Sequence, residues 1–280
     1  MRTGAVALAA AGALLAALAA CATPPPVPAA PPRPWAPAVA AEPVDPDAAY
    51  VAARLADMTL TERAASVVMV HLPGTDPEAM RAGIADSGIA GVILMGDNTQ
   101  RSVEATAALT AGLAADPALP PLTAVDQEGG IVARLPDPGP SARVLGALPA
   151  EASREAFAAR AALVASAGIE VNFGIVADVT ADPGSFLAPR VFGPDADAVS
   201  ARVREAVAGE RGIVLSTLKH FPGHGGAPGD SHRVVPVTAM GLEEWRATQA
   251  PPFAAGIDAG AELVMMGHLG YTSVDPAPAS

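Results

Sequence analysis

Six short apolar runs recur along the chain, and helix-like stretches separate most of them. This alternation limits the possible folds more than any other feature of the sequence. The runs occupy residues 67–70, 91–95, 122–125, 171–176, 214–218 and 263–266. Continuous apolar runs are typical of strands buried on both faces, and strands separated by helices pair in parallel. The order therefore predicts an α/β fold.

Six units of this kind, each ending in polar residues, favour a (β/α)8 barrel of the TIM type over a doubly wound sheet. A closed barrel needs eight strands, so we expect about six of the eight βα units within these 280 residues. Helical patterns cover residues 47–57, 151–167 and 195–209, and Thr59 with Glu62 has the spacing of a capping box. We expect the barrel domain to occupy residues 47–280.

The first 21 residues have the pattern of an export signal. Arg2 precedes an apolar run over residues 5–20, which is short for a membrane span. Leu18-Ala19-Ala20-Cys21 resembles a bacterial lipobox, in which the cysteine becomes the lipidated first residue. We therefore expect a lipoprotein-type signal peptide over residues 1–21, with lipidation at Cys21, the single cysteine. An ordinary cleaved signal and an uncleaved anchor are the alternatives.

Residues 22–46 are rich in Pro and Ala. Such a stretch cannot form a helix or a sheet ladder, so it predicts an extended linker. Together, signal and linker predict an exported protein, lipid-anchored at the cell membrane through Cys21 or extracellular.

Charge limits the partners. The formal net charge of −12 repels phosphate backbones, which argues against nucleic acid as a partner. The basic residues are almost all Arg, and Lys219 is the only lysine. A lysine that survives in such a sequence suggests chemistry that Arg cannot replace.

Polar residues follow the apolar runs and would gather at the carboxyl-terminal rim of a barrel, where active sites are built. They include Asp97, Asp126, Asp178, Lys219 and His268. Three of the five histidines also fall within residues 219–232, a segment with several Gly and Pro that predicts a loop at a strand end. We expect an active-site loop there.

A metal site is a competing interpretation of His220, His224 and His232. Their spacings of four and eight residues fall on a Gly/Pro loop, and neither a Cys cluster nor a helical His-Glu-x-x-His pattern accompanies them. No metal and no cofactor is therefore expected.

Several motifs resemble glycoside hydrolase family 3, in the variant of its β-N-acetylglucosaminidases. The motifs are Lys219-His220-Phe221-Pro222-Gly223-His224-Gly225 with Asp230-Ser231-His232, Val125-Asp126-Gln127-Glu128-Gly129-Gly130 with Arg134, Val171-Asn172-Phe173 with Asp178, Pro189-Arg190-Val191-Phe192-Gly193, and Met265-Met266-Gly267-His268 with Tyr271 and Val274-Asp275-Pro276. The likeness spans roughly residues 50 to 280, and its motifs occur in the family's order.

The resemblance implies which residues bind the non-reducing sugar. They are Asp126, Arg134, Arg190, Lys219 and His220. The alternatives are a loop-capping role for the aspartate and surface ion pairs for the two arginines. Asp178 is left out of the sugar-contacting set, because it could instead brace the Lys219-His220 pair.

The resemblance also implies that His232 is the general acid, where most glycosidases use a carboxylic acid. In an extended loop, residues two apart point to the same side, so Asp230 can accept a hydrogen bond from one ring nitrogen of His232. A nearby carboxylate favours the protonated imidazole, which can donate to the departing oxygen. The alternative is an ordinary exposed loop pair.

The implied activity is that of an exo-acting retaining β-N-acetylhexosaminidase. Its substrates would be amino-sugar oligosaccharides, namely peptidoglycan fragments or chitooligosaccharides from which terminal N-acetylglucosamine is hydrolysed. A β-N-acetylglucosaminide phosphorylase and a non-catalytic surface glycan-binding lipoprotein are the alternatives.

The family's nucleophile is an Asp on a strand that follows the motif Val274-Asp275-Pro276, and no Asp within the 280 residues has that context. We therefore expect the sequence to be a fragment of a longer gene product. The alternative is a truncated and inactive product.

Overall fold

The computed structural model describes residues 45–114 and 119–275. The signal peptide, Cys21 and nearly all of the linker lie outside these ranges, so the assignments made for them stay predictions. The chain divides into two compact units, residues 1–50 and 51–280, and the fold described below is that of the second unit.

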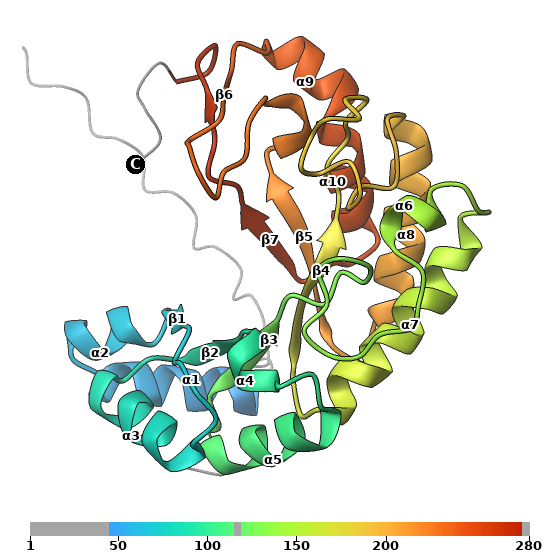
Figure 1. Ribbon diagram of the computed structural model, residues 1–280. Coiled ribbons are helices and arrows are strands. Elements are labelled where there is room, and N and C mark those ends of the chain that lie inside the picture. Colours follow the sequence, from blue (N-terminus) through green and yellow to red (C-terminus); the bar gives the residue numbers. More distant parts are fainter. Residues whose placement is uncertain (1–44, 115–118, 276–280) are drawn as a thin grey trace, which may run out of the picture. The chain divides into compact units, whose positions relative to one another are not determined.

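A six-stranded parallel sheet forms the centre of this unit, in the order β1-β2-β3-β4-β5-β7. Its strands are β1 (Met69–Val70), β2 (Gly91–Leu94), β3 (Leu122–Val125), β4 (Val171–Val176), β5 (Leu215–Phe221) and β7 (Leu263–Met266). Neighbouring strands of this sheet follow one another along the chain, apart from a short strand between β5 and β7 that belongs to another sheet, and the sheet curls into a half-barrel (Figure 1). A doubly wound sheet reverses its strand order, so this order confirms the predicted barrel class.

Two helices precede the first strand and the others follow later strands, and several of these helices cover the convex side of the curved sheet (Figure 1). They are α1 (Pro46–Asp57), α2 (Leu60–Ala65), α3 (Pro77–Ser87), α4 (Gly96–Thr99), α5 (Val103–Leu113), α6 (Ala142–Leu145), α7 (Glu151–Ser166), α8 (Ala196–Glu210), α9 (Leu242–Thr248) and α10 (Ala250–Asp258), with a 3-10 turn over His224–Gly226. The predicted capping box is present, because the Thr59 hydroxyl accepts from the Glu62 amide while the Glu62 carboxylate accepts from the Thr59 amide.

The hydrophobic core lies between the sheet and these helices. Leu94 and Val125 belong to a buried cluster with Leu113 of α5 and Val164 of α7. A second buried cluster includes Ile175 and Leu218 together with helix residues of α7, α8 and α10. Burial of apolar strand faces against helices is the main stabilising contribution here. Within residues 45–114 and 119–275, no helix is long and apolar enough to cross a membrane.

Two predicted strand boundaries are wrong by more than one residue. The first strand starts at Met69 instead of residue 67, because Val67 belongs to the turn after α2 and is 84% exposed. The fifth strand continues to Phe221 instead of ending at residue 218, so Lys219 and His220 belong to the strand and not to the loop after it. A short parallel pair, β6 (Val237–Thr238) with β8 (Gly270–Tyr271), was not predicted.

Glu210, at the end of α8, has a fully buried carboxylate that accepts a hydrogen bond of 2.6 Å from the Asn172 side chain. Burial raises the pKa of Glu210 from 4.5 to about 7, although the Asn172 hydrogen bond opposes this shift. Between these two values the folded state holds a proton that the unfolded state has released. The free energy of unfolding should therefore fall as pH rises through this window.

Replacing Glu210 with Gln keeps an oxygen acceptor for Asn172 and removes the ionisable group. We expect Glu210→Gln to be more stable than the wild type by about 3 kcal/mol at pH 8 and similar to it at pH 5. Urea unfolding of the full-length protein at both pH values measures this. The matched control is Glu205→Gln, since Glu205 pairs with the exposed Arg154. Equal pH slopes for wild type and Glu210→Gln would contradict the prediction.

Candidate active site

Lys219 lies near the end of β5, with its side chain only 2% exposed. Its ammonium nitrogen is 2.7 Å from Asp126 Oδ1 and 2.7 Å from Glu128 Oε1. Both carboxylates follow β3, whose carboxyl end meets the same rim of the sheet as that of β5. Lys219, the only lysine of the sequence, is thus a buried cation held by two carboxylates, and the three groups form a preorganised charged site.

Arg190 reaches the same centre from the segment between β4 and α8. Its Nε and Nη2 donate to the two oxygens of Glu128 over 2.9 and 2.7 Å, a bidentate pair. Burial works to raise the pKa of Glu128, but the cations of Lys219 and Arg190 outweigh it and hold that pKa below its usual range. Glu128 therefore bridges two of the predicted sugar-binding residues as an anion.

Glu128 was not among the predicted site residues, although it belongs to the same polar stretch as Asp126. The predicted residue Arg134 lies close by, with its Nη2 3.8 Å from Asp126 Oδ2. Its backbone amide donates to Gln127 Oε1 over 2.9 Å, which fixes the loop after β3. The structure thus brings Arg134 to the carboxylate that also contacts Lys219.

Asp178 braces the end of β5 from the end of β4 and is fully buried. One carboxylate oxygen lies 2.7 Å from His220 Nδ1 and accepts the His220 amide over 3.2 Å, while the other accepts the His224 amide over 2.6 Å. This fixes the His220 ring with its Nε2 3.4 Å from Arg190 Nη2. All five predicted sugar-binding residues therefore belong to one group of side chains, with Asp178 behind it.

His232 and Asp230 form the predicted pair, since His232 Nδ1 is 2.6 Å from Asp230 Oδ1. The local geometry differs from the predicted extended loop. The segment is a turn, in which the Asp230 carbonyl accepts the amide of Arg233 over 2.9 Å and its carboxylate accepts the His232 amide over 3.0 Å. Hydrogen bonds from His232 lower the pKa of Asp230, so it stays an anion beside the imidazole.

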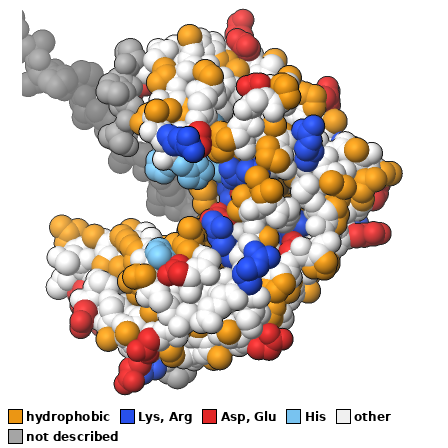
Figure 2. All heavy atoms as spheres, in the orientation of Figure 1, with side chains coloured by type: hydrophobic (Ala, Val, Ile, Leu, Met, Phe, Trp, Pro, Cys, Tyr) orange, Lys and Arg blue, Asp and Glu red, His pale blue; other side chains and the backbone are white. Residues whose placement is uncertain are grey.

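Phe186 connects this turn to the group of predicted sugar-binding residues. Its ring centroid is 5.8 Å from that of His232 and 4.9 Å from that of His224, and the Arg190 guanidinium carbon lies 5.6 Å from it. Figure 2 shows Lys, Arg and His side chains gathered around one hollow of the surface. The turn with His232 therefore lies next to the rim that carries Lys219. No sequence pattern indicated Phe186.

His224 is buried beneath Phe186, and neither of its ring nitrogens has a hydrogen-bond partner among the described residues. Burial lowers the pKa of its imidazole, which favours the neutral form. Across the described part of the chain, no group of three or more His, Cys, Asp and Glu side chains is arranged to hold a metal ion.

Known proteins are similar to this chain in sequence and in fold. The family model described as glycosyl hydrolase family 3 N terminal domain matches residues 59–280. A β-hexosaminidase of Stenotrophomonas maltophilia is 33% identical over 225 residues, which are 76% of this chain and 67% of that protein. A family 3 β-N-acetylglucosaminidase from Paenibacillus has a TM-score of 0.71 at 30% identity, over 79% of this chain and 44% of that one.

NagZ from Neisseria gonorrhoeae, solved in complex with N-trifluoroacetyl-D-glucosamine, has a TM-score of 0.68 at 30% identity. The matched region covers 75% of this chain and 66% of NagZ. The chain thus spans less than half of the Paenibacillus enzyme and about two thirds of the other two proteins. The family match over most of the chain, on a sheet of the expected order, shows that this chain belongs to glycosyl hydrolase family 3.

Proposed function

We propose that the protein is an exo-acting retaining β-N-acetylhexosaminidase that removes terminal N-acetylglucosamine from peptidoglycan fragments or chitooligosaccharides. The observation that carries this proposal is the His232–Asp230 pair, placed beside the charged group of Lys219, Asp126 and Arg190. The Stenotrophomonas relative is a β-hexosaminidase, and the Neisseria relative was solved with N-trifluoroacetyl-D-glucosamine.

The charged group is suited to hold one terminal sugar. Hydroxyl groups are recognised best by charged donors and acceptors, and Asp126, Lys219 and His220 offer both kinds at one rim. Because the ion pairs exist before any sugar binds, little ordering is left to occur on binding.

His232 supplies the proton in this mechanism. Asp230 holds Nδ1, which leaves Nε2 to donate to the glycosidic oxygen as that bond breaks. The Asp230 anion stabilises the imidazolium before the transfer. The imidazole that remains can then accept a proton from the incoming water. Retention also needs a carboxylate nucleophile on the opposite face of the sugar, and we assign that role to none of the described residues.

A phosphorylase is the second candidate, and the imidazole favours it. A histidine acid is neutral after it has given up its proton, so it repels an incoming phosphate less than a carboxylate would.

The test uses the complete gene product and the substrate p-nitrophenyl N-acetyl-β-D-glucosaminide. Proton NMR, recorded with and without phosphate, identifies the first sugar product that is released. We expect the β-anomer of N-acetylglucosamine to form first, at a rate that phosphate does not change. N-acetylglucosamine 1-phosphate would identify the phosphorylase, and the α-anomer would exclude retention. No turnover of any substrate would leave the glycan-binding alternative.

A further inference from the structure

Gln127 lies between Asp126 and Glu128 in the sequence, and the proposed function gives it no role. It is fully buried, and its side chain makes three hydrogen bonds to the segment that carries Arg134. Its Oε1 accepts the amides of Arg134 over 2.9 Å and of Leu135 over 3.0 Å, and its Nε2 donates to the Leu135 carbonyl over 3.2 Å. Both polar atoms of this side chain therefore hold the backbone at or next to Arg134.

The guanidinium group of Arg134 has few contacts of its own. Its Nη2 lies 3.8 Å from Asp126 Oδ2, which is longer than a hydrogen bond. Its Nε is buried and has no hydrogen-bond partner among the described residues. The backbone, in contrast, is fixed on both sides, since the Arg134 carbonyl accepts the Thr99 hydroxyl over 2.9 Å and the amide is held by Gln127. The direction of the Arg134 side chain is therefore set mainly by its backbone.

The backbone of Gln127 is in turn fixed by Asn172 of β4. The β3–β4 ladder ends with Val125 opposite Asn172. Beyond this point the Asn172 side chain replaces the neighbouring strand, because its Oδ1 accepts the Gln127 amide and its Nδ2 donates to the Gln127 carbonyl, both over 3.2 Å. A Cβ at Gly174 would collide with Asn172 Nδ2 and with the Gln127 carbonyl, so this pairing needs a glycine there. Glu210 accepts a further hydrogen bond from the same Nδ2.

We propose that Gln127 is a positioning residue for sugar binding, which holds Arg134 at a fixed place relative to Asp126 so that both contact the same sugar. The inference rests on the proposed function, which places the terminal sugar at these residues. Asn172 fixes the main chain of Gln127 next to Asp126, and the Gln127 side chain fixes Arg134. One buried residue thus sets the spacing between an anion and a cation before the sugar binds, which reduces the ordering that binding requires.

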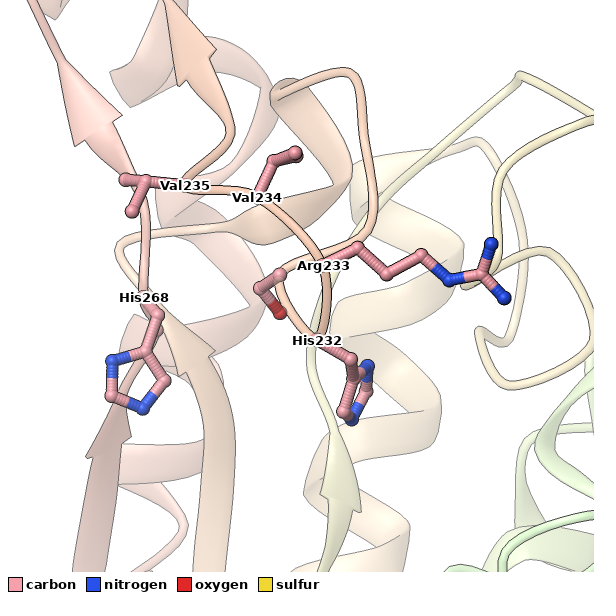
Figure 3. Close-up of a pocket in the computed structure, with 7 residues that line it drawn as sticks. His232, Arg233, Val234, Val235 and His268 are labelled. Carbon is pink, nitrogen blue, oxygen red and sulfur yellow. The ribbon is translucent and has the colours of Figure 1, made fainter.

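The proton donor lies outside this network. Figure 3 shows His232 on the turn after β5 and His268 at the end of a neighbouring strand. The cavity that these two residues line includes neither Gln127 nor any of its hydrogen-bond partners. A change at Gln127 should therefore leave the dependence of kcat/KM on the leaving group as in the wild type, which distinguishes its role from that of His232.

The first test replaces Gln127 with methionine, which has a similar volume and makes none of the three hydrogen bonds. The full-length protein is assayed with p-nitrophenyl N-acetyl-β-D-glucosaminide. We expect KM to rise about ten- to hundredfold and kcat to change less than about threefold, because a charged hydrogen bond is lost from the bound sugar and from the transition state alike. A lower kcat with an unchanged KM would indicate loss of folded protein and would overturn the proposal.

Gln127→Glu is the matched variant, and it also tests the role if Gln127→Met does not fold. A protonated carboxyl group has one donor and one acceptor, as the Gln127 amide does, whereas an ionised one only accepts. Burial and the neighbouring charges of Asp126 and Glu128 favour the protonated form, and Arg134 opposes this. Relative to the wild type at the same pH, KM should be nearly unchanged near pH 5 and about tenfold higher near pH 8. A ratio that does not change with pH would contradict the proposal.

Two further variants locate the effect. Added to Arg134→Ala, the change Gln127→Met should lower kcat/KM by less than about another twofold, since Gln127 acts through Arg134. Thr110→Val removes a hydroxyl that donates to the Ala167 carbonyl before β4, and it should leave KM within about twofold of the wild type. Fully additive losses at Gln127 and Arg134 would overturn the positioning role. A wild type that neither cleaves the glycoside nor binds N-acetylglucosamine would instead refute the proposed function, and this inference with it.

Discussion

Replacing His232 with alanine should lower kcat/KM about 10²- to 10⁴-fold for glycosides with poor leaving groups, the range that a general acid contributes. Glycosides whose leaving groups are already acidic should lose far less, since they depart without a proton. The measurement is kcat/KM for a series of aryl N-acetyl-β-glucosaminides, plotted against the pKa of the released phenol. We expect a steeper negative slope for His232→Ala than for the wild type. Equal losses across the series would contradict proton donation by His232.

Asp230→Asn is the matched variant, because it keeps the shape of the pair and removes the charge. Without the carboxylate 2.6 Å from Nδ1, the imidazole loses the anion that orients it for proton donation. Asp230→Asn should therefore lower kcat/KM more for glycosides with poor leaving groups than for those with acidic ones. A kcat/KM equal to that of the wild type across the series would mean that Asp230 does not assist His232.

Replacing Lys219 with methionine should destabilise the protein by about 3–5 kcal/mol, the usual cost of removing one partner from a buried ion pair. Lys219 is 2% exposed and touches Asp126 and Glu128, so the variant leaves two carboxylates facing each other without the cation between them. Urea unfolding of the full-length protein measures the loss. Sugar hydrolysis should fall to background in the same variant.

A control variant and a pH dependence test whether the loss of stability in Lys219→Met comes from the lost ion pairs. Arg154→Met removes a cation from a solvent-exposed pair with Glu205 and should cost less than about 1 kcal/mol. The deficit of Lys219→Met should also shrink as pH falls below the ordinary carboxyl range. The depressed pKa of Glu128 contributes stability only while that group is ionised. A deficit that is equal at all pH values would point to lost packing instead of lost charge pairing.

Apolar runs predicted the main sheet well, since β2, β3, β4 and β5 are mostly buried and such burial leaves a continuous apolar run in the sequence. The ends of the strands were harder to predict from the sequence. β5 continues through Lys219 and His220, whose polar side chains look like loop residues until their partners on β3 and β4 are known. β6 and β8 are two residues long, too short for any periodic pattern.

The motifs predicted most residues of the site. The residues that they did not predict are those whose role depends on partners far away in the sequence. Glu128 bridges Lys219 and Arg190, which lie 91 and 62 residues away along the chain in groups that only the folded sheet assembles. Phe186 has no motif, yet its ring lies between His232 and Arg190. Local sequence carries no signal for such contacts.

The buried carboxylate of Asp178 has a mechanical consequence. It accepts the backbone amides of both His220 and His224, so the chain is attached at two points, four residues apart, to the segment that follows β4. The position of His220 on the rim therefore depends on Asp178, and the turn that carries His232 begins only after the second of these two attachments.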